Sequence, residues 1–263
     1  MAEVETTARP EPPRAADTAS PATEMTLSVF RGDANGGQER EYKVPVGPGM
    51  VVLDAVHWLQ ANVDSSLAAR WNCKAARCGS CSAEINGHPG LMCKTRLDEF
   101  GGDVVHVRPM HTFPVIKDLV TDVSWNYKVA KQIPPFKPPH PAPFIMYQRD
   151  VERGQEFRKC IECFLCQDIC HVLREHSGKD HYFGPRFMIK IAELEMNPMD
   201  TEDRLGLLAH DGGLGYCNIT KCCQEVCPEH IHITDNAIIP LKERSADRYW
   251  DPIRRLFRRR QTG

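Results

Sequence analysis

The sequence predicts an α+β chain in which a sheet domain is followed by a helical domain, each organised around cysteines. Three observations lead to this prediction. The N-terminal part alternates like strands around one cysteine loop, a proline-rich segment follows, and the second half has helical patterns between two further cysteine runs. A chain of 263 residues is long enough for two such domains.

Composition limits where the chain works and what it binds. Its net charge of −2 gives no general attraction to nucleic acid. No apolar run is long enough to cross a membrane, and the N-terminus resembles neither a secretory signal nor an Arg-rich transit peptide. We therefore expect a bacterial cytoplasmic protein whose 12 cysteines are reduced.

The first domain is predicted to be a β-grasp ferredoxin domain over residues 25–132. Alternating residues predict two strands, and apolar residues three and four apart predict a helix after them. These elements are expected over 25–30, 41–46 and 52–59. A strand over 104–107 closes the expected sheet.

The first cysteine loop predicts a plant-type [2Fe–2S] cluster, because its spacing is C-x4-C-x2-C with a fourth cysteine twelve residues later. The predicted ligands are Cys73, Cys78, Cys81 and Cys93. Gly79 and Ser80 are small, which lets backbone amides turn toward the sulfurs and stabilise the negative charge of a cluster. Asn86-Gly87 predicts a tight hairpin that returns the chain to the fourth cysteine. Four buried structural cysteines are the alternative.

A connector and two tails complete the predicted organisation. Residues 115–131 are expected to form a helix, and the prolines of 133–144 predict a stiff, extended linker or, less simply, a ligand for a proline-reading module. Residues 1–24 are predicted to be a disordered tail, since their composition cannot bury a core. The tail 249–263 mixes aromatic and basic residues, which suits an anionic membrane surface, a partner subunit or plain solvation.

The second domain is predicted to be a helical, bacterial-type ferredoxin domain over residues 145–248. Its helices are expected over 151–157, 166–175, 185–196, 203–209 and 234–247. Its cysteines form two runs with one rhythm, C-x2-C-x2-C-x3-C, in which Thr220 takes the second place of the second run.

In bacterial-type ferredoxins the first three cysteines of a run bind one cluster and the fourth binds the other. The rule assigns a [4Fe–4S] cluster to Cys160, Cys163, Cys166 and Cys227. Three thiolates then remain for a [3Fe–4S] cluster, namely Cys170, Cys217 and Cys223. Cys222 is a rival ligand, but its neighbour is Cys223, so its side chain is expected to point elsewhere. Zinc, which takes four ligands in two pairs, and disulfides are the weaker interpretations.

From residue 25 to residue 247 the chain resembles the iron–sulfur subunit of succinate dehydrogenase and of its relative fumarate reductase. The resemblance rests on the three cysteine groups in order, on Arg77-Cys78-Gly79-Ser80-Cys81, on residues 111–120 and on Gly184-Pro185. It implies an electron path from the FAD of a flavoprotein subunit through [2Fe–2S], [4Fe–4S] and [3Fe–4S] clusters to membrane quinone. The chain then needs no acid, base or nucleophile, because the chemistry belongs to the cofactors.

The resemblance also implies partners and a location. The flavoprotein subunit would bind the N-terminal domain and membrane-anchor subunits the C-terminal domain, on the cytoplasmic face of a bacterial plasma membrane. The chain would serve the tricarboxylic acid cycle and the respiratory chain. A fumarate reductase working in the reverse direction and a soluble multi-cluster ferredoxin are the alternatives.

Two departures from the family pattern concern the quinone pocket. His171 follows Cys170 where the family commonly has Pro, and Asn218 stands where it commonly has His. No Trp lies between Trp125 and Trp250, although the family uses one to hold the quinone. The quinone-binding residues therefore stay unassigned. We hypothesise that anchor subunits bind the quinone, or that another redox centre in them precedes it.

Overall fold

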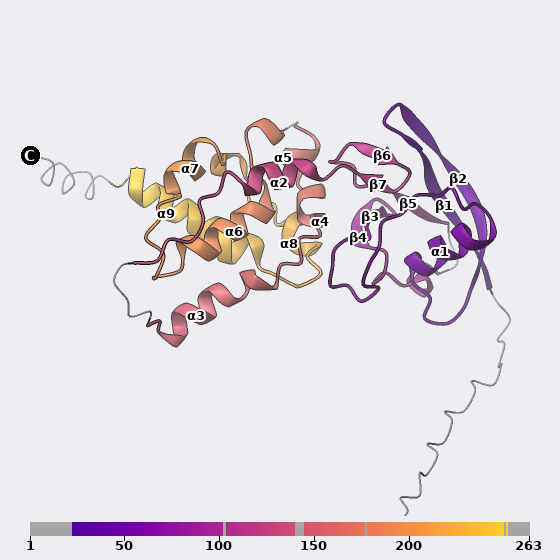
Figure 1. Ribbon diagram of the computed structural model, residues 1–263, viewed down its shortest axis with the longest axis horizontal. Helices are drawn as coiled ribbons and strands as arrows, with labels where there is room; N and C mark the ends of the chain where they lie inside the picture. The colour runs from indigo at the N-terminus through magenta and orange to yellow at the C-terminus, as the bar shows by residue number, and fades with distance from the viewer. Residues whose placement is uncertain (1–22, 102–103, 140–144, 177, 250, 252–263) are drawn as a thin grey trace, which may run out of the picture.

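The computed structural model describes residues 23–101, 104–139, 145–176, 178–249 and 251. They form a sheet domain and a helical domain, which follow one another end to end along the long axis of the molecule (Figure 1). The predicted α+β class is confirmed. Most of both predicted tails, and part of the proline-rich segment, lie outside the described residues. None of the described helices is long and apolar enough to cross a membrane.

The sheet has seven strands among the described residues, in the order β4-β3-β5-β1-β6-β7, and β2 pairs with β1. Their bounds are β1 Thr23–Asp33, β2 Gly36–Val46, β3 Ser82–Ile85, β4 His88–Leu91, β5 Val105–Arg108, β6 Val115–Lys117 and β7 Val120–Thr121. β1 and β2 form a long antiparallel hairpin, whereas β5 runs parallel to β1. This hairpin with a parallel partner matches the predicted β-grasp arrangement.

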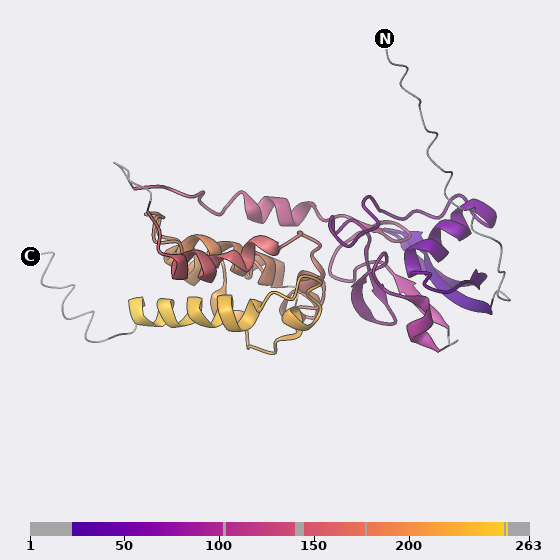
Figure 2. The same cartoon turned by 90° about the horizontal axis from the view of Figure 1, so that it is seen from below.

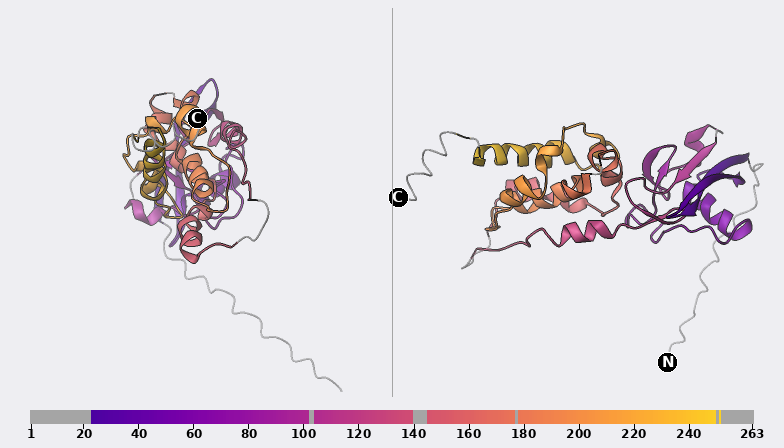
Figure 3. Two further views of the ribbon diagram at one scale, coloured as in Figure 1. Left: turned by 90° about the vertical axis from the view of Figure 1, so that its left-hand side faces the viewer. Right: turned by 90° about the horizontal axis from the view of Figure 1, so that it is seen from above.

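Helix α1, Val52–Asn62, packs against the sheet with one apolar face (Figure 3). Its buried residues are Val52, Leu53, Ala55, Val56 and Leu59. They share one core with Leu27 and Val29 of β1 and with alternate residues of β5. The spacing of these residues is that of an amphipathic helix, and the predicted helix is confirmed.

The prediction of a helix over residues 115–131 is wrong for the first half of that segment. This part forms β6 and β7, and only α2, Ser124–Ala130, is helical. Asp118 turns the chain between the strands with a φ of 49°. Its carboxylate accepts hydrogen bonds from Arg31 Nε at 3.0 Å and from the amide of Ala68 at 2.8 Å. These contacts are distant in sequence and outweigh the local helical spacing.

The helical domain consists of short helices joined by cysteine loops. Its helices are α3 Gln148–Gln155, α4 Leu165–Asp168, α5 His171–Arg174, α6 Pro185–Glu195, α7 Leu205–His210, α8 Cys222–Glu225 and α9 Ile239–Tyr249. A π-helical segment over Ile233–Ile238 leads into α9. Single-turn 3₁₀ helices span Phe157–Lys159, Gly178–Asp180 and Leu214–Tyr216, and Leu97–Phe100 in the sheet domain. The predicted helix 166–175 is thus interrupted before Cys170, and α8 was not predicted.

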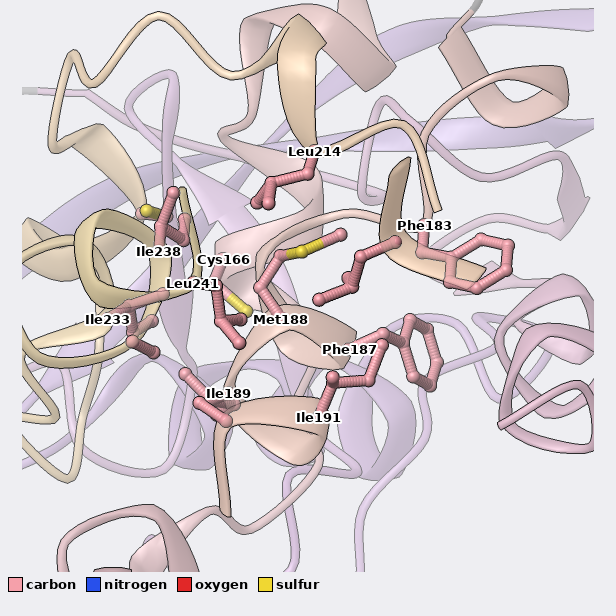
Figure 4. Packing of buried hydrophobic residues seen from close by; sticks show 14 of the residues in the cluster. Cys166, Phe183, Phe187, Met188, Ile189, Ile191, Leu214, Ile233, Ile238 and Leu241 are labelled. Carbon is pink, nitrogen blue, oxygen red and sulfur yellow. The ribbon is translucent and has the colours of Figure 1, made fainter. Parts of the chain in front are cut away.

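Helix α6 forms the centre of the helical core. Phe187, Met188 and Ile191 of α6 are buried in one core with residues of the π-helical segment, which contacts α6, and with Leu241 of α9. Cys166 lies in the same cluster of buried side chains (Figure 4). Helix α6 therefore contributes to the core and, through Arg186 and Ile189, also bounds a predicted cluster site.

The described part of the proline-rich connector runs alongside the helical domain (Figure 2) and contacts it. Ile133 belongs to the helical core, as does Val129 of α2. Arg204 donates hydrogen bonds to the carbonyls of Pro134 at 2.8 Å and Pro135 at 2.6 Å. The exact domain boundaries stay a prediction.

Candidate iron–sulfur centres

The first cysteine loop folds its backbone around two of the predicted ligand sulfurs. Lys74 and Ala76 have left-handed φ angles of 53° and 54°, which turn successive amides inward. The amides of Ala75 and Ala76 donate to Sγ of Cys73 and Cys93 at 3.4 and 3.3 Å. Such donors stabilise negative charge on a cluster.

The four thiols of this loop interact with one another. Burial acts to raise the pKa of Cys78, but hydrogen bonds with Ser80 and Cys73 outweigh it and lower this pKa to about 7. Burial raises the pKa of Cys81 to about 12, with contributions from Cys93 and Cys78. The structure therefore brings all four predicted [2Fe–2S] ligands together.

The second group surrounds a small cavity between the first run and the end of the second. Four cysteines line it, namely Cys160, Cys163, Cys166 and Cys227. Burial raises the pKa of Cys163 to about 12 and holds that of Cys166 well above its usual value, and the neighbouring thiols add repulsion. Cys227 thus lies with the first three cysteines of the other run, in the arrangement expected from bacterial-type ferredoxins.

The third group contains Cys170, Cys217 and Cys223. Burial raises the pKa of Cys170 to about 11 and that of Cys223 to about 12, and the thiols of the group repel one another. Thr234 Oγ1 lies 3.6 Å from Cys223 Sγ, where its hydroxyl favours the thiolate. Within the described residues, no three His, Cys, Asp or Glu side chains are arranged to hold a single metal ion.

Two buried donors test whether these groups fit clusters. Arg186 Nε has no hydrogen-bond partner among the described residues, and the buried Tyr182 hydroxyl has none there other than the Cys217 thiol, a predicted ligand. Tyr182 is 1% exposed, and its hydroxyl interacts with the thiols of the third group, while Arg186 lines the cavity of the second. Buried donors normally have partners. Cluster sulfurs would supply the missing acceptors, so the residues fit the clusters.

Sequence reasoning missed both donors. The only sequence feature that could have indicated these two donors was the Gly184-Pro185 motif, which lies between them in the chain. Gly184 has a φ of 87°, and a side chain there would overlap the side chain of Gln167. The motif therefore lets α6 begin close to the first cysteine run, which brings both donors to the centres.

Thr220 in the second cysteine run corresponds to Cys163 in the first run, both in sequence spacing and in the backbone conformation around it. The residues on either side of Cys163 have φ angles of 56° and 62°, and those on either side of Thr220 have 65° and 64°. A short helix begins after each loop, α4 in the first run and α8 in the second. The second run thus repeats the first without its second thiol.

Cys222 lies close to the third group, and its expected orientation away from that centre stays a prediction. Its thiol contributes to the raised pKa values of Cys170 and Cys223, and its Sγ lies 3.4 Å from Thr220 Oγ1. In the repeat, however, Cys222 takes the position of Leu165, which is a buried apolar residue of the first run. The three-thiol ligand set therefore stays our prediction.

We expect Thr220→Cys to convert the third centre into a four-iron cluster of lower reduction potential, because a fourth thiolate adds negative charge. Low-temperature electron paramagnetic resonance (EPR) of the oxidised protein should lose the three-iron signal. Thr220→Ser keeps a hydroxyl and should retain that signal. An undiminished three-iron signal in Thr220→Cys would contradict the assignment, and loss of the centre in Cys222→Ser would identify Cys222 as a ligand.

The first and second groups meet where the two domains touch. A Cβ at Gly79 would lie only 2.6 Å from Cys163 Cα, so the two loops are in backbone contact. Ser82 Oγ lies within hydrogen-bond distance of the carbonyls of Gly79 and Cys163, at 2.8 and 2.9 Å. The second and third groups are also neighbours, since Cys223 contributes to the raised pKa of Cys166. The three groups thus form one continuous series.

The residues near the third group that were considered for quinone have other contacts. Arg174 Nη1 pairs with Glu84 Oε1 of β3 at 2.5 Å and so joins the two domains. His171 contacts His176 edge to face, and the His181 ring stacks on Tyr216 at 6.0 Å. None of these contacts assigns a quinone-binding residue.

Comparison with known proteins supports the order of the two domains. Residues 26–128 match the 2Fe-2S iron-sulfur cluster binding domain family, and residues 156–231 match the 4Fe-4S dicluster domain family. A chain of the Mycobacterium smegmatis Sdh1 complex in the apo form is 59% identical, with a TM-score of 0.86. The match covers 88% of this chain and 99% of that one.

Two further relatives match over both domains. The fumarate reductase iron-sulfur subunit of Haemophilus influenzae is 28% identical over 228 residues, which are 79% of this chain and 88% of that protein. An uncharacterized iron-sulfur protein of Methanocaldococcus jannaschii is 32% identical over 213 residues, or 79% of this chain and 41% of that longer protein. The chain therefore belongs to the family of electron-transferring iron–sulfur subunits of succinate dehydrogenase and fumarate reductase.

Proposed function

We propose that this chain is the iron–sulfur subunit of a succinate dehydrogenase that passes electrons singly from the FAD of a flavoprotein subunit toward membrane quinone. The observation that carries the proposal is the continuous series of three cysteine groups across the domain contact. Their order along the molecule gives an electron an entry at the sheet domain and an exit at the helical domain.

The proposed ligands follow this order. The [2Fe–2S] cluster is held by Cys73, Cys78, Cys81 and Cys93. The [4Fe–4S] cluster is held by Cys160, Cys163, Cys166 and Cys227. The [3Fe–4S] cluster is held by Cys170, Cys217 and Cys223. Each cluster supplies one-electron chemistry, and the chain's residues fix its position, exclude water and tune its potential.

Exposed apolar side chains near the first and third groups support the proposed partners. Trp71 is 47% exposed beside the first cysteine loop, with Lys74 Nζ 5.0 Å from its ring centroid, and this surface suits the flavoprotein subunit. Tyr216 and Ile219, beside Cys217, are 57% and 39% exposed. This second surface suits membrane-anchor subunits, which would hold the chain at the cytoplasmic face of a bacterial plasma membrane.

Two residues near the third group favour quinone binding by the anchor subunits. Arg174 is already paired with Glu84, and Asn218 has no aromatic ring to pack against a quinone. A fumarate reductase is the second candidate, because the Haemophilus influenzae relative carries that name. The measured cluster potentials and the quinone used decide the direction.

The complex that co-purifies with this chain tests the proposal. We expect flavin, iron and sulfide together, an oxidised three-iron EPR signal, and a [2Fe–2S] signal after reduction by succinate. The measurements are metal and flavin quantification with low-temperature EPR. Zinc in place of iron, or a chain that elutes alone without flavoprotein, would overturn the proposal.

A further inference from the structure

Arg186 is a buried cation at the second cysteine group. It is the second residue of α6 and is 8% exposed. It lines the cavity bounded by the four cysteines of that group. A buried guanidinium is costly to leave partly unpaired, so its surroundings call for an explanation.

Its contacts leave one N–H donor of the guanidinium without a partner, although the guanidinium carbon lies 5.8 Å from the centroid of the Phe187 ring. Nη2 donates to Glu162 Oε1 at 2.5 Å, and the Glu162 side chain is 53% exposed. Nε is buried and has no partner among the described residues. Glu229 also lines the cavity, but it is paired with Arg77 at 3.3 Å. Arg186 thus brings a positive charge, and an N–H donor without a partner among the described residues, to a cavity lined by the predicted ligands.

We infer that Arg186 raises the reduction potential of the cluster held by Cys160, Cys163, Cys166 and Cys227, through its charge and through a hydrogen bond from Nε to a cluster sulfur. The inference rests on the proposed function, which supplies the cluster. One electron enters from the [2Fe–2S] centre and one leaves to the third centre, and no bond is made or broken. The reduced cluster is more negative by one charge, so a nearby cation stabilises it more than the oxidised cluster.

Burial makes the effect of this charge large. Interactions between charges are screened weakly in a protein interior and strongly at its surface. Arg158 provides a matched comparison, because its side chain is 63% exposed and it lies two residues before Cys160. Loss of either side chain removes one positive charge, but only Arg186 lines the cavity.

The test is a redox titration, followed by EPR, of the complex containing Arg186→Gln, Arg186→Lys or Arg158→Gln. We expect Arg186→Gln to lower the midpoint potential of the [4Fe–4S] cluster. Arg186→Lys should lower it less, and Arg158→Gln should leave it near the wild-type value. The [2Fe–2S] potential serves as an internal reference. An unchanged [4Fe–4S] potential in Arg186→Gln, or equal shifts in Arg186→Gln and Arg158→Gln, would overturn the inference.

A second measurement needs no variant and so does not depend on cluster assembly after mutation. In the wild-type complex with arginine labelled with ¹⁵N at Nε, pulsed EPR of the reduced [4Fe–4S] cluster should detect a coupled nitrogen. No coupling would overturn the hydrogen bond. A wild-type complex without any [4Fe–4S] signal would instead refute the proposed function, so the two failures are distinguishable.

Discussion

Arg204→Ala is expected to destabilise the helical domain by about 3–5 kcal/mol, the range for breaking a buried ion pair from one side. The Arg204 side chain is fully buried. Its Nη2 lies 3.0 Å from Asp200 Oδ2, and its Nη1 lies 3.8 Å from Glu195 Oε1. Removing the guanidinium leaves two buried carboxylates without this cation and frees the connector carbonyls of Pro134 and Pro135.

Lys137→Ala is the matched control, because Lys137 is a cation on the same connector that pairs with Glu202 at 3.7 Å but is 67% exposed. An exposed pair of this kind contributes about 0–1 kcal/mol. Thermal unfolding of the complex and limited proteolysis of the connector compare the variants. Equal melting temperatures for Arg204→Ala and the wild type would show that Arg204 does not secure the connector.

The cysteine groups could be predicted because their information is local. Short steps between cysteines place thiols within one loop and helical turn, and the crossed pairing of Cys170 and Cys227 follows from a rule about spacing. The alternation in β1 and the apolar face of α1 are local in the same sense. Asn86 and Gly87 have φ angles of 49° and 79°, so the predicted hairpin turn is also confirmed.

The features that sequence reasoning missed depend on contacts between distant segments. The turn at Asp118 is held by Arg31 and Ala68, and no helical or strand period records such a contact. Tyr182 and Arg186 are buried near the cysteine groups only once the segment leading into α6 and α6 itself have packed there. Their residue types alone indicate solvent-exposed positions as readily as a cluster environment.

For Gly79, sequence reasoning predicted the need for a small residue but gave only part of the physical reason. Its small size was expected to let amides turn toward the sulfurs of its own loop. The structure adds a second requirement, the close approach of Cys163 from the other domain. A contact of this kind becomes visible only when both domains are placed together.

Gly79→Ala is therefore expected to separate the first and second centres and to slow electron passage between them at least ~10-fold, equivalent to ~1.4 kcal/mol in the barrier. The φ of Gly79 is 67°, which costs a non-glycine residue about 1–2 kcal/mol. The new Cβ would also lie 2.6 Å from Cys163 Cα and 2.9 Å from Cys163 N. Both are backbone atoms, so relief requires the two domains to move apart.

Gly87→Ala is the control that separates the steric clash between the domains from the backbone penalty of replacing a glycine. Gly87 has a φ of 79°, but a Cβ there would meet no atom within 4 Å. It therefore carries a similar backbone penalty without the contact between domains. Rapid-freeze EPR after mixing the complex with succinate should show delayed reduction of the third centre in Gly79→Ala and near-normal reduction in Gly87→Ala. Equal rates in the two variants would mean that electrons do not cross at the contact between Gly79 and Cys163.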